Sequence, residues 1–196
     1  MKLHAIAASA LAALCATGLL AGQGCFGPIG IVGEEGGVEL PRLKHGAYTD
    51  ILFGAAGESI VWVVVGDTRD LCGEIEQRVN AGMPCFDGWG DVDRLHIRLP
   101  GRPDGTYTVE GGACFSEFGT LPEAAGCFEG DDGLGLSGFG SASADSGTIS
   151  VTRWVELEHI DGRVDLTFPD GSWALGSFSA RNCPALNNCC AEVGCF

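Results

Sequence analysis

Cysteine is the residue type that offers most chemistry in this chain. Ten of the 196 residues are cysteines, and nine of these lie at or beyond position 25. Their thiols can form disulfides, bind a soft metal ion or carry a lipid. An odd number is awkward in an oxidising compartment, because one thiol is left over. Lipidation of Cys25 would leave an even set of eight for disulfides. These are Cys72, Cys85, Cys114, Cys127, Cys183, Cys189, Cys190 and Cys195.

The first 24 residues have the pattern of an export signal. Lys2 precedes an apolar run over residues 5–20, which is followed by small and polar residues up to Gly24. This run is shorter than the about 20 apolar residues that a transmembrane helix needs. Residues 20–25, Leu-Ala-Gly-Gln-Gly-Cys, resemble a bacterial lipobox, in which the cysteine becomes the acylated N-terminus. We therefore predict a signal peptide over residues 1–24 and lipidation of Cys25, with a plain signal-peptidase cut near Gly24 as the alternative.

Two pairs of cysteines are spaced for local disulfides. Cys72 and Cys85 flank a segment with helical periodicity, and a bond between them would join that helix to the following loop. Cys114 and Cys127 enclose 12 residues, and a bond closing such a loop costs the unfolded chain roughly 3 kcal/mol of entropy. The four last cysteines lie within residues 182–196 and either pair among themselves or reach back to the domain. A zinc site is the competing interpretation, but an oxidising compartment and the lack of two Cys-x-x-Cys knuckles favour disulfides.

Other side chains offer weaker chemistry. Glu129, Asp131 and Asp132 lie in a glycine-rich turn that can wrap a hard cation, yet the alternating acidic spacing of an EF-hand loop is missing. They are weak metal candidates, and we expect neither a metal nor another cofactor. Trp89 and Trp154 are the tryptophans best suited to stack on a ligand, since one lies in a glycine-rich turn and the other on the polar face of a strand.

Common catalytic signatures are missing from the sequence. It contains no Gly-x-Ser-x-Gly elbow, and its histidines form no His-x-x-x-His pair. With 26 acidic residues, some pair of carboxylates is always available, so abundance alone is not evidence for carboxylate hydrolysis. We therefore predict that the protein is not an enzyme.

Composition indicates an exported globular domain with many turns. Removing residues 1–24 removes Lys2 and no acidic residue, so the formal charge moves from −15 to about −16. A field of this sign repels phosphate backbones and disfavours nucleic acid as a partner. The 32 glycines are scattered along the chain, and several Asp-Gly pairs separate alternating apolar segments, which is typical of β-hairpins.

Most of the elements that would position these residues are strands. Residues 47–53 and 59–65 predict two strands, and the second is the continuous apolar run of a strand covered on both faces. Residues 92–99 alternate leucine and isoleucine with arginine and histidine, so one face of this strand is wet or partnered. A three-stranded meander is predicted over residues 148–158, 163–168 and 172–180, with turns at Asp161-Gly162 and Asp170-Gly171.

One short helix is predicted over residues 70–80, where apolar residues recur at every fourth position. Thr68 or Asp70 can cap its start, and Gly82 can end it. The predicted fold is all-β: an antiparallel sandwich or barrel-like meander with one short helix, cross-linked by disulfides. We divide the chain into a signal peptide (1–24), a lipid-attachment segment and flexible tether (25–44), a β domain (45–181) and a cysteine-rich C-terminal tail (182–196).

Four segments together make up a strand-and-turn pattern, namely residues 103–109, 147–151, 165–171 and 176–180. Together with Cys114 and Cys183, this pattern resembles a group of uncharacterised bacterial lipoproteins. The resemblance covers roughly residues 45–183. It implies a β-rich domain that contains disulfides, and it implies no activity.

These observations predict a non-enzymatic lipoprotein of the bacterial cell envelope with a structural or binding role. Its expected partners are the membrane, through the lipid anchor, and an envelope protein or glycan, but no nucleic acid. Phe26 follows the anchor in place of an aspartate, which favours the outer membrane, with periplasmic or secreted locations as alternatives. The competing functions are a secreted hydrolase that uses carboxylates and a protease inhibitor or effector that acts through residues 182–196.

Overall fold

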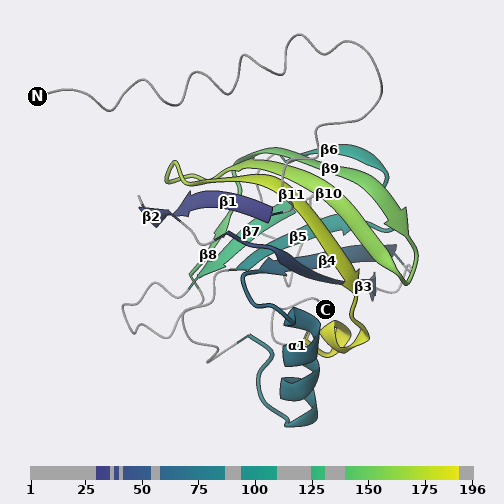
Figure 1. Ribbon diagram of the computed structural model, residues 1–196. Coiled ribbons are helices and arrows are strands. Elements are labelled where there is room, and N and C mark those ends of the chain that lie inside the picture. The colour runs from purple at the N-terminus through teal and green to yellow at the C-terminus, as the bar shows by residue number, and fades with distance from the viewer. Residues whose placement is uncertain are drawn as a thin grey trace, which may run out of the picture.

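The fold is one strongly curled β-sheet with a short helix against part of its outside (Figure 1). The computed structural model describes residues 30–35, 38–39, 42–53, 58–86, 94–109, 125–130 and 140–189. The elements are β1 (Gly30–Glu35), β2 (Val38–Glu39), β3 (His45–Phe53), β4 (Glu58–Gly66), α1 (Leu71–Asn80), β5 (Arg94–Pro100), β6 (Gly105–Val109), β7 (Ala125–Gly130), β8 (Gly140–Ser143), β9 (Ser146–Val155), β10 (His159–Thr167), β11 (Trp173–Asn182) and the 3-10 helix η1 (Pro184–Cys189). The all-β, barrel-like prediction with one short α-helix is therefore confirmed.

The main path of the sheet is β6-β9-β10-β11-β3-β4-β5-β7-β8. The sheet divides at β11. One edge of this strand pairs with β10, and two strands share its other edge. β1 pairs antiparallel with its first half, whereas β3 pairs parallel with its last three residues, Ala180 to Asn182. The sequence predicted a wholly antiparallel arrangement, and this one parallel pair departs from it. The long connection between β3 and β11 permits a parallel pair, which a hairpin cannot form.

Strand β4 has a hydrophobic core on each of its faces, as its continuous apolar sequence predicted. Val61, Val63 and Val65 point into the main core, inside the curl of the sheet. Trp62 and Val64 point the other way, into a second core beneath α1 and η1. Successive side chains of a strand face opposite sides, so a strand between two cores has no polar face.

The polar face of β5 is buried and partnered. Arg94, His96 and Arg98 are 4%, 3% and 2% exposed, so the alternative that this face is wet is wrong. The indole Nε1 of Trp62 donates to Nδ1 of His96 at 3.3 Å, and the two rings stack with centroids 5.7 Å apart. The Arg94 guanidinium lies 5.0 Å from the ring centroid of Phe86 and donates to that residue's carbonyl oxygen at 3.2 Å. Such pairing offsets the cost of burying polar groups.

The α1 helix forms where the apolar periodicity predicted it. Asp70 is the residue that caps its start, since its carboxylate accepts from the backbone N–H of Gly73 at 3.2 Å. Leu71 and Ile75 are buried against the sheet. Gly82 follows the helix with φ +64°, a left-handed conformation that glycine adopts without strain. Among the described residues, no helix has both the length and the apolar character needed to cross a membrane.

The predicted tether over residues 25–44 is wrong for residues 30–35. They form β1, which pairs with residues 173–177 of β11 in register from Gly30 opposite Ser177 to Glu34 opposite Trp173. Ile31 is 1% exposed within the main core. Glycines made this stretch resemble a linker, but a strand forms because a glycine of β11 lets the two backbones approach: a Cβ on Gly176 would lie 2.3 Å from the carbonyl oxygen of Gly30.

The predicted turn at Asp161-Gly162 is also wrong. Both residues lie inside β10, and the β9–β10 hairpin turns at residues 156–158, with Leu157 at φ +60°. Gly162 instead permits a β-bulge, at which the register between β9 and β10 shifts by one residue. The Asp170-Gly171 turn is confirmed, and Gly171 has φ +87°.

Candidate functional site

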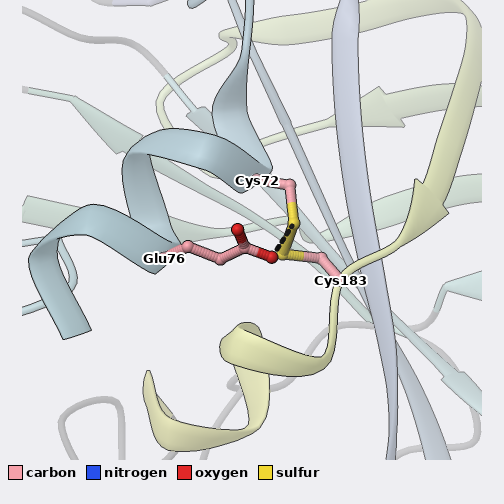
Figure 2. A group of neighbouring side chains, drawn as sticks. All are labelled: Cys72, Glu76 and Cys183. Carbon is pink, nitrogen blue, oxygen red and sulfur yellow. Dashed lines mark hydrogen bonds between the residues drawn. A yellow bond between two sulfur atoms is a disulfide. The ribbon is translucent and has the colours of Figure 1, made fainter. Parts of the chain in front are cut away.

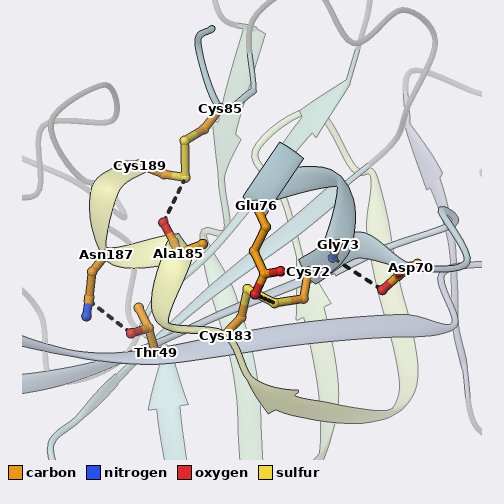
Figure 3. The surroundings of a disulfide bond; sticks show 10 residues. All are labelled: Thr49, Asp70, Cys72, Gly73, Glu76, Cys85, Cys183, Ala185, Asn187 and Cys189. Atoms are coloured by element: carbon orange, nitrogen blue, oxygen red, sulfur yellow. Dashed lines mark hydrogen bonds between the residues drawn. A yellow bond between two sulfur atoms is a disulfide. The ribbon is translucent and has the colours of Figure 1, made fainter. Parts of the chain in front are cut away.

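Two disulfides join α1 and the loop after it to the C-terminal segment. Cys72 bonds to Cys183 and Cys85 bonds to Cys189, across sequence separations of 111 and 104 residues (Figure 3). The predicted Cys72–Cys85 bond is therefore wrong. Proximity in sequence suggested it, whereas η1 lies beside α1 in space and offers each of these cysteines a different partner. The sequence left open whether the tail cysteines pair with one another or with the domain. Cys183 and Cys189 pair with cysteines of the domain.

The first part of the tail belongs to the folded domain. Leu186 and Cys189 are buried in the second core, and the hydroxyl of Thr49 in β3 donates to the Asn187 side chain at 2.9 Å (Figure 3). Residues 183–189 are thus held by covalent bonds, by apolar burial and by hydrogen bonding. The prediction that residues 182–196 form a separate tail is wrong for residues 183–189. These residues are packed against the domain and do not form a free loop.

Cys72, Glu76 and Cys183 form the one group of potential metal ligands in the described part of the chain (Figure 2). Their ligand atoms lie within 4.8 Å of one another, and Sγ of Cys72 is 3.7 Å from Oε1 of Glu76. The two sulfurs are bonded to each other, so neither is available as the thiolate that binds a metal ion. In this oxidised form the group is a disulfide with a carboxylate beside it.

A shallow groove lies on the outer face of β9, β10 and β11, on the side of these strands away from the main core. It has a volume of about 430 Å³. Its side chains include three hydroxyl groups, two opposite charges and one apolar side chain: Thr148, Ser150, Ser177, Arg163, Asp165 and Leu175. Short side chains on β9 and β11 leave the hollow, and Arg163 and Asp165 project from β10 between them.

Exposed apolar side chains border this groove. Leu175 is 48% exposed and lies directly opposite Val32 of β1, which is 38% exposed. Trp173, at 37% exposed, is two residues before Leu175 on the same face of β11. Three of the large apolar residues that stay exposed in the described structure therefore lie on neighbouring positions of one sheet face, which we call the outer-face patch (Val32, Trp173 and Leu175).

The Asp50 carboxyl group lies at the end of the sheet near the β9–β10 turn. Burial raises its pKa, and the charge of Glu156 raises it further. Tyr48, two residues earlier on the same face of β3, donates its hydroxyl to the carbonyl oxygen of Val155 at 3.3 Å. Burial and the charge of Asp50 raise the Tyr48 pKa. A carboxyl of raised pKa near a second charge is one part of what the hydrolase alternative requires, which also includes a cleft and two carboxylates about 5 to 9.5 Å apart.

Known proteins supply no template for these three sites. Comparison with protein families, curated proteins and solved structures finds no match.

Most of the other predicted site residues lie outside the described residues. Cys25, Trp89, Cys114, Asp131, Asp132, Cys190 and Cys195 are among these. Cys127 and Glu129 are in β7, but the structure describes only their backbone. The Cys114–Cys127 bond therefore stays a prediction, and so does the expectation that the weak candidates Glu129, Asp131 and Asp132 hold no metal.

The prediction that Trp154 lies on the exposed face of its strand is wrong. The register shift after Val151 changes which side chains of β9 face inward, so Trp154 packs against the main core. Its indole Nε1 is buried without a hydrogen-bond partner among the described residues. Among the described residues, Trp173 is the tryptophan on the outer face. The sequence predicted that Trp173 and Leu175 share one face of their strand, but not that this face is exposed. The alternation of polar and apolar residues over 163–168 was the available signal for the charged part of the groove.

Proposed function

We propose that the protein is a lipoprotein anchored through Cys25 in the bacterial outer membrane, where it has a non-enzymatic binding role. The observation that carries the exported location is the pair of disulfides between α1 and its following loop on one side and the C-terminal segment on the other. Such bonds form and persist in oxidising compartments, so the domain folds outside the cytoplasm. The lipobox-like residues 20–25 support the anchor.

The outer face of the sheet supports the binding role. Binding surfaces are commonly rigid scaffolds that present a few polar groups beside apolar area. The groove and the outer-face patch have this composition, and they lie on strands held by long antiparallel ladders. Loops need not order for these side chains to be in place, so the entropy cost of binding is small.

The anchor is tested by the intact mass of the protein from membranes of its native host. We expect a mass that corresponds to cleavage before Cys25 plus an acyl modification, with cysteines 72, 85, 183 and 189 oxidised. Cys25→Ala should abolish the acyl mass and the membrane association, while Cys15→Ala, within the predicted signal peptide, should change neither. An unmodified, soluble protein with free thiols would show that the proposal is wrong.

A secreted hydrolase is the second candidate, because burial and the charge of Glu156 raise the pKa of the Asp50 carboxyl. In that case Asp50→Asn and Glu156→Gln would each abolish hydrolysis of a substrate that the purified wild-type protein cleaves. A protein that binds its ligand unchanged and has the same affinity in both variants would favour the binding role.

A further inference from the structure

We propose that the outer face of β9, β10, β11 and β1 is a binding site for a neutral glycan. This inference rests on the proposed binding role and names the ligand class and the residues. It uses the groove of about 430 Å³ together with the outer-face patch that borders it.

The polar groups of the groove form two adjacent rows across the strands. In one row, Arg163 of β10 lies between Ser150 of β9 and Ser177 of β11. In the next row, Asp165 lies between Thr148 and Leu175. Neighbouring positions across strands are about 5 Å apart, and rows on one face are about 7 Å apart. Donors and acceptors at these spacings match a ligand that carries several hydroxyl groups around a compact ring.

The two charged side chains suit hydroxyl groups particularly well. The Arg163 guanidinium only donates hydrogen bonds and the Asp165 carboxylate only accepts them, whereas a sugar hydroxyl can do both. Hydrogen bonds to charged groups are also stronger than those between neutral groups. The hydroxyls of Thr106 and Ser150 already bond to each other at 2.8 Å, which fixes the Ser150 side chain at the edge of the groove.

The outer-face patch provides the apolar part of such a site. A pyranose ring has C–H groups on its faces and hydroxyls around its rim, so it packs on apolar or aromatic surface while its rim forms hydrogen bonds. Leu175 lines the groove itself, and Val32 and Trp173 continue the apolar surface to one side of it. This order of a polar groove followed by apolar side chains suits a chain of sugar residues that crosses the strands.

The negative charge of the protein favours a neutral glycan over an anionic one. The chain has a formal charge of −15, and the groove contains one cation beside one anion. An anionic polysaccharide would be repelled by the whole molecule without a cluster of cations to offset the repulsion. A protein partner is less well matched, because the groove and the outer-face patch together comprise ten residues, fewer than the about 20 to 30 residues that each partner contributes to a standard interface.

Calorimetry on the full mature lipoprotein tests the proposal, in a detergent whose headgroup is not a sugar. The probes are neutral hexasaccharides of glucose, mannose, galactose and N-acetylglucosamine, with hexagalacturonate as the anionic comparison. We expect measurable affinity for at least one neutral hexasaccharide and at least tenfold weaker binding of hexagalacturonate. Arg163→Ala, Asp165→Ala and Trp173→Ala should each weaken the neutral complex about tenfold or more.

Met83→Ala is the matched control, since Met83 is 45% exposed and lies after α1 rather than on the outer face. It should leave the affinity unchanged, and all variants should retain both disulfides in non-reduced peptide maps. Absence of binding to every neutral hexasaccharide would overturn the inference, as would equal loss in Met83→Ala. A monomer–dimer equilibrium abolished by Trp173→Ala would identify the face as a contact between copies and would also overturn it. The acyl mass and oxidation state test the anchor separately, so a glycan-negative but acylated protein rejects this inference alone.

Discussion

At the scale of single residues, Asp50 shows how burial couples stability to pH. Burial and then the charge of Glu156 raise the pKa of this carboxyl above its ordinary value of 3.8. The folded protein therefore holds the Asp50 proton to higher pH than the unfolded chain does. This group favours folding most below pH 3.8, and that contribution is lost as pH rises through the folded-state pKa.

Asp50→Asn should consequently raise the free energy of unfolding at pH 7. The expected gain is no more than about 1 kcal/mol, because solvent screens a carboxylate that is only partly buried. The gain should shrink as pH falls towards 3.8 and vanish below it. Urea unfolding from pH 3 to pH 7 measures this, with the exposed Asp165→Asn as the comparison. A gain of equal size at every pH would contradict the stated cause.

We predict that Glu76 protects the Cys72–Cys183 disulfide from reduction. The sulfur of Cys183 is buried, so an attacking thiolate must approach the half-buried Cys72 sulfur, and the Glu76 carboxylate lies 3.7 Å from it. Repulsion between anions slows that attack. Glu76→Gln should speed reduction several-fold for glutathione and less for cysteamine, whose amine cancels its thiolate charge. Exposed Glu74 on the same helix provides the control variant Glu74→Gln, and stopped alkylation followed by mass spectrometry gives the rates.

At the scale of elements, the pairing of β1 with β11 depends on a glycine that tolerates no side chain. Gly176 has φ +153°, and a Cβ there would lie 2.3 Å from the Gly30 carbonyl oxygen and 2.8 Å from the Ile31 Cα. Both contacts are with backbone, which cannot move aside without separating the strands. The pair also sets the opposition of Val32 and Leu175, so its loss would disperse the outer-face patch.

Gly176→Ala should therefore lower the free energy of unfolding by more than about 2 kcal/mol, through steric overlap added to the strain of the left-handed conformation. Gly171→Ala is a matched control, because Gly171 also has positive φ but has nothing within 4 Å of its Cβ position. It should cost only about 1 kcal/mol. Thermal unfolding and hydrogen exchange of the β1 amides distinguish the two variants. Equal costs would show that only backbone conformation matters at position 176.

At the scale of the whole molecule, the two disulfides join segments from the middle and the end of the chain. Each closes a loop of more than 100 residues, as the separations of 111 and 104 show. A crosslink of that span reduces the entropy of the unfolded chain, which raises its free energy by about 4 to 5 kcal/mol at room temperature. The contributions of two overlapping loops do not simply add. The second core between β4, α1 and η1 depends on these bonds, because it is small and includes four cysteines.

Truncation tests this dependence. A chain that ends at Asn182 loses both disulfides and the buried Leu186, and we expect its free energy of unfolding to fall by at least about 4 kcal/mol. A chain that ends at Cys189 keeps both bonds and should lose little. Denaturant unfolding under non-reducing conditions makes the comparison. If the shorter chain were as stable as the longer one, residues 183–189 would be a separable tail after all.

Much of the fold could be predicted from sequence because local patterns determine it. The apolar run of β4 places a core on each side of it, and the four-residue periodicity with Asp70 specifies α1. The alternation in β5 separated the polar from the apolar residues correctly. These properties follow from the fixed periods of strands and helices, which neighbouring residues alone establish.

The tertiary structure alone decided which distant residues meet. Cys72 bonds to Cys183 in place of Cys85 because η1 packs beside α1, and no sequence spacing records that contact. Likewise, the bulge at Gly162 turned Trp154 inward, and the pairing of β1 with β11 put Val32 beside Leu175. The sequence by itself thus determined the kind and the buried face of elements such as β4 and α1, but not the strand at residues 30–35 or the face on which Trp154 lies. Strand order, register and disulfide partners required the folded molecule, because they depend on contacts between segments whose separation along the chain leaves many pairings open.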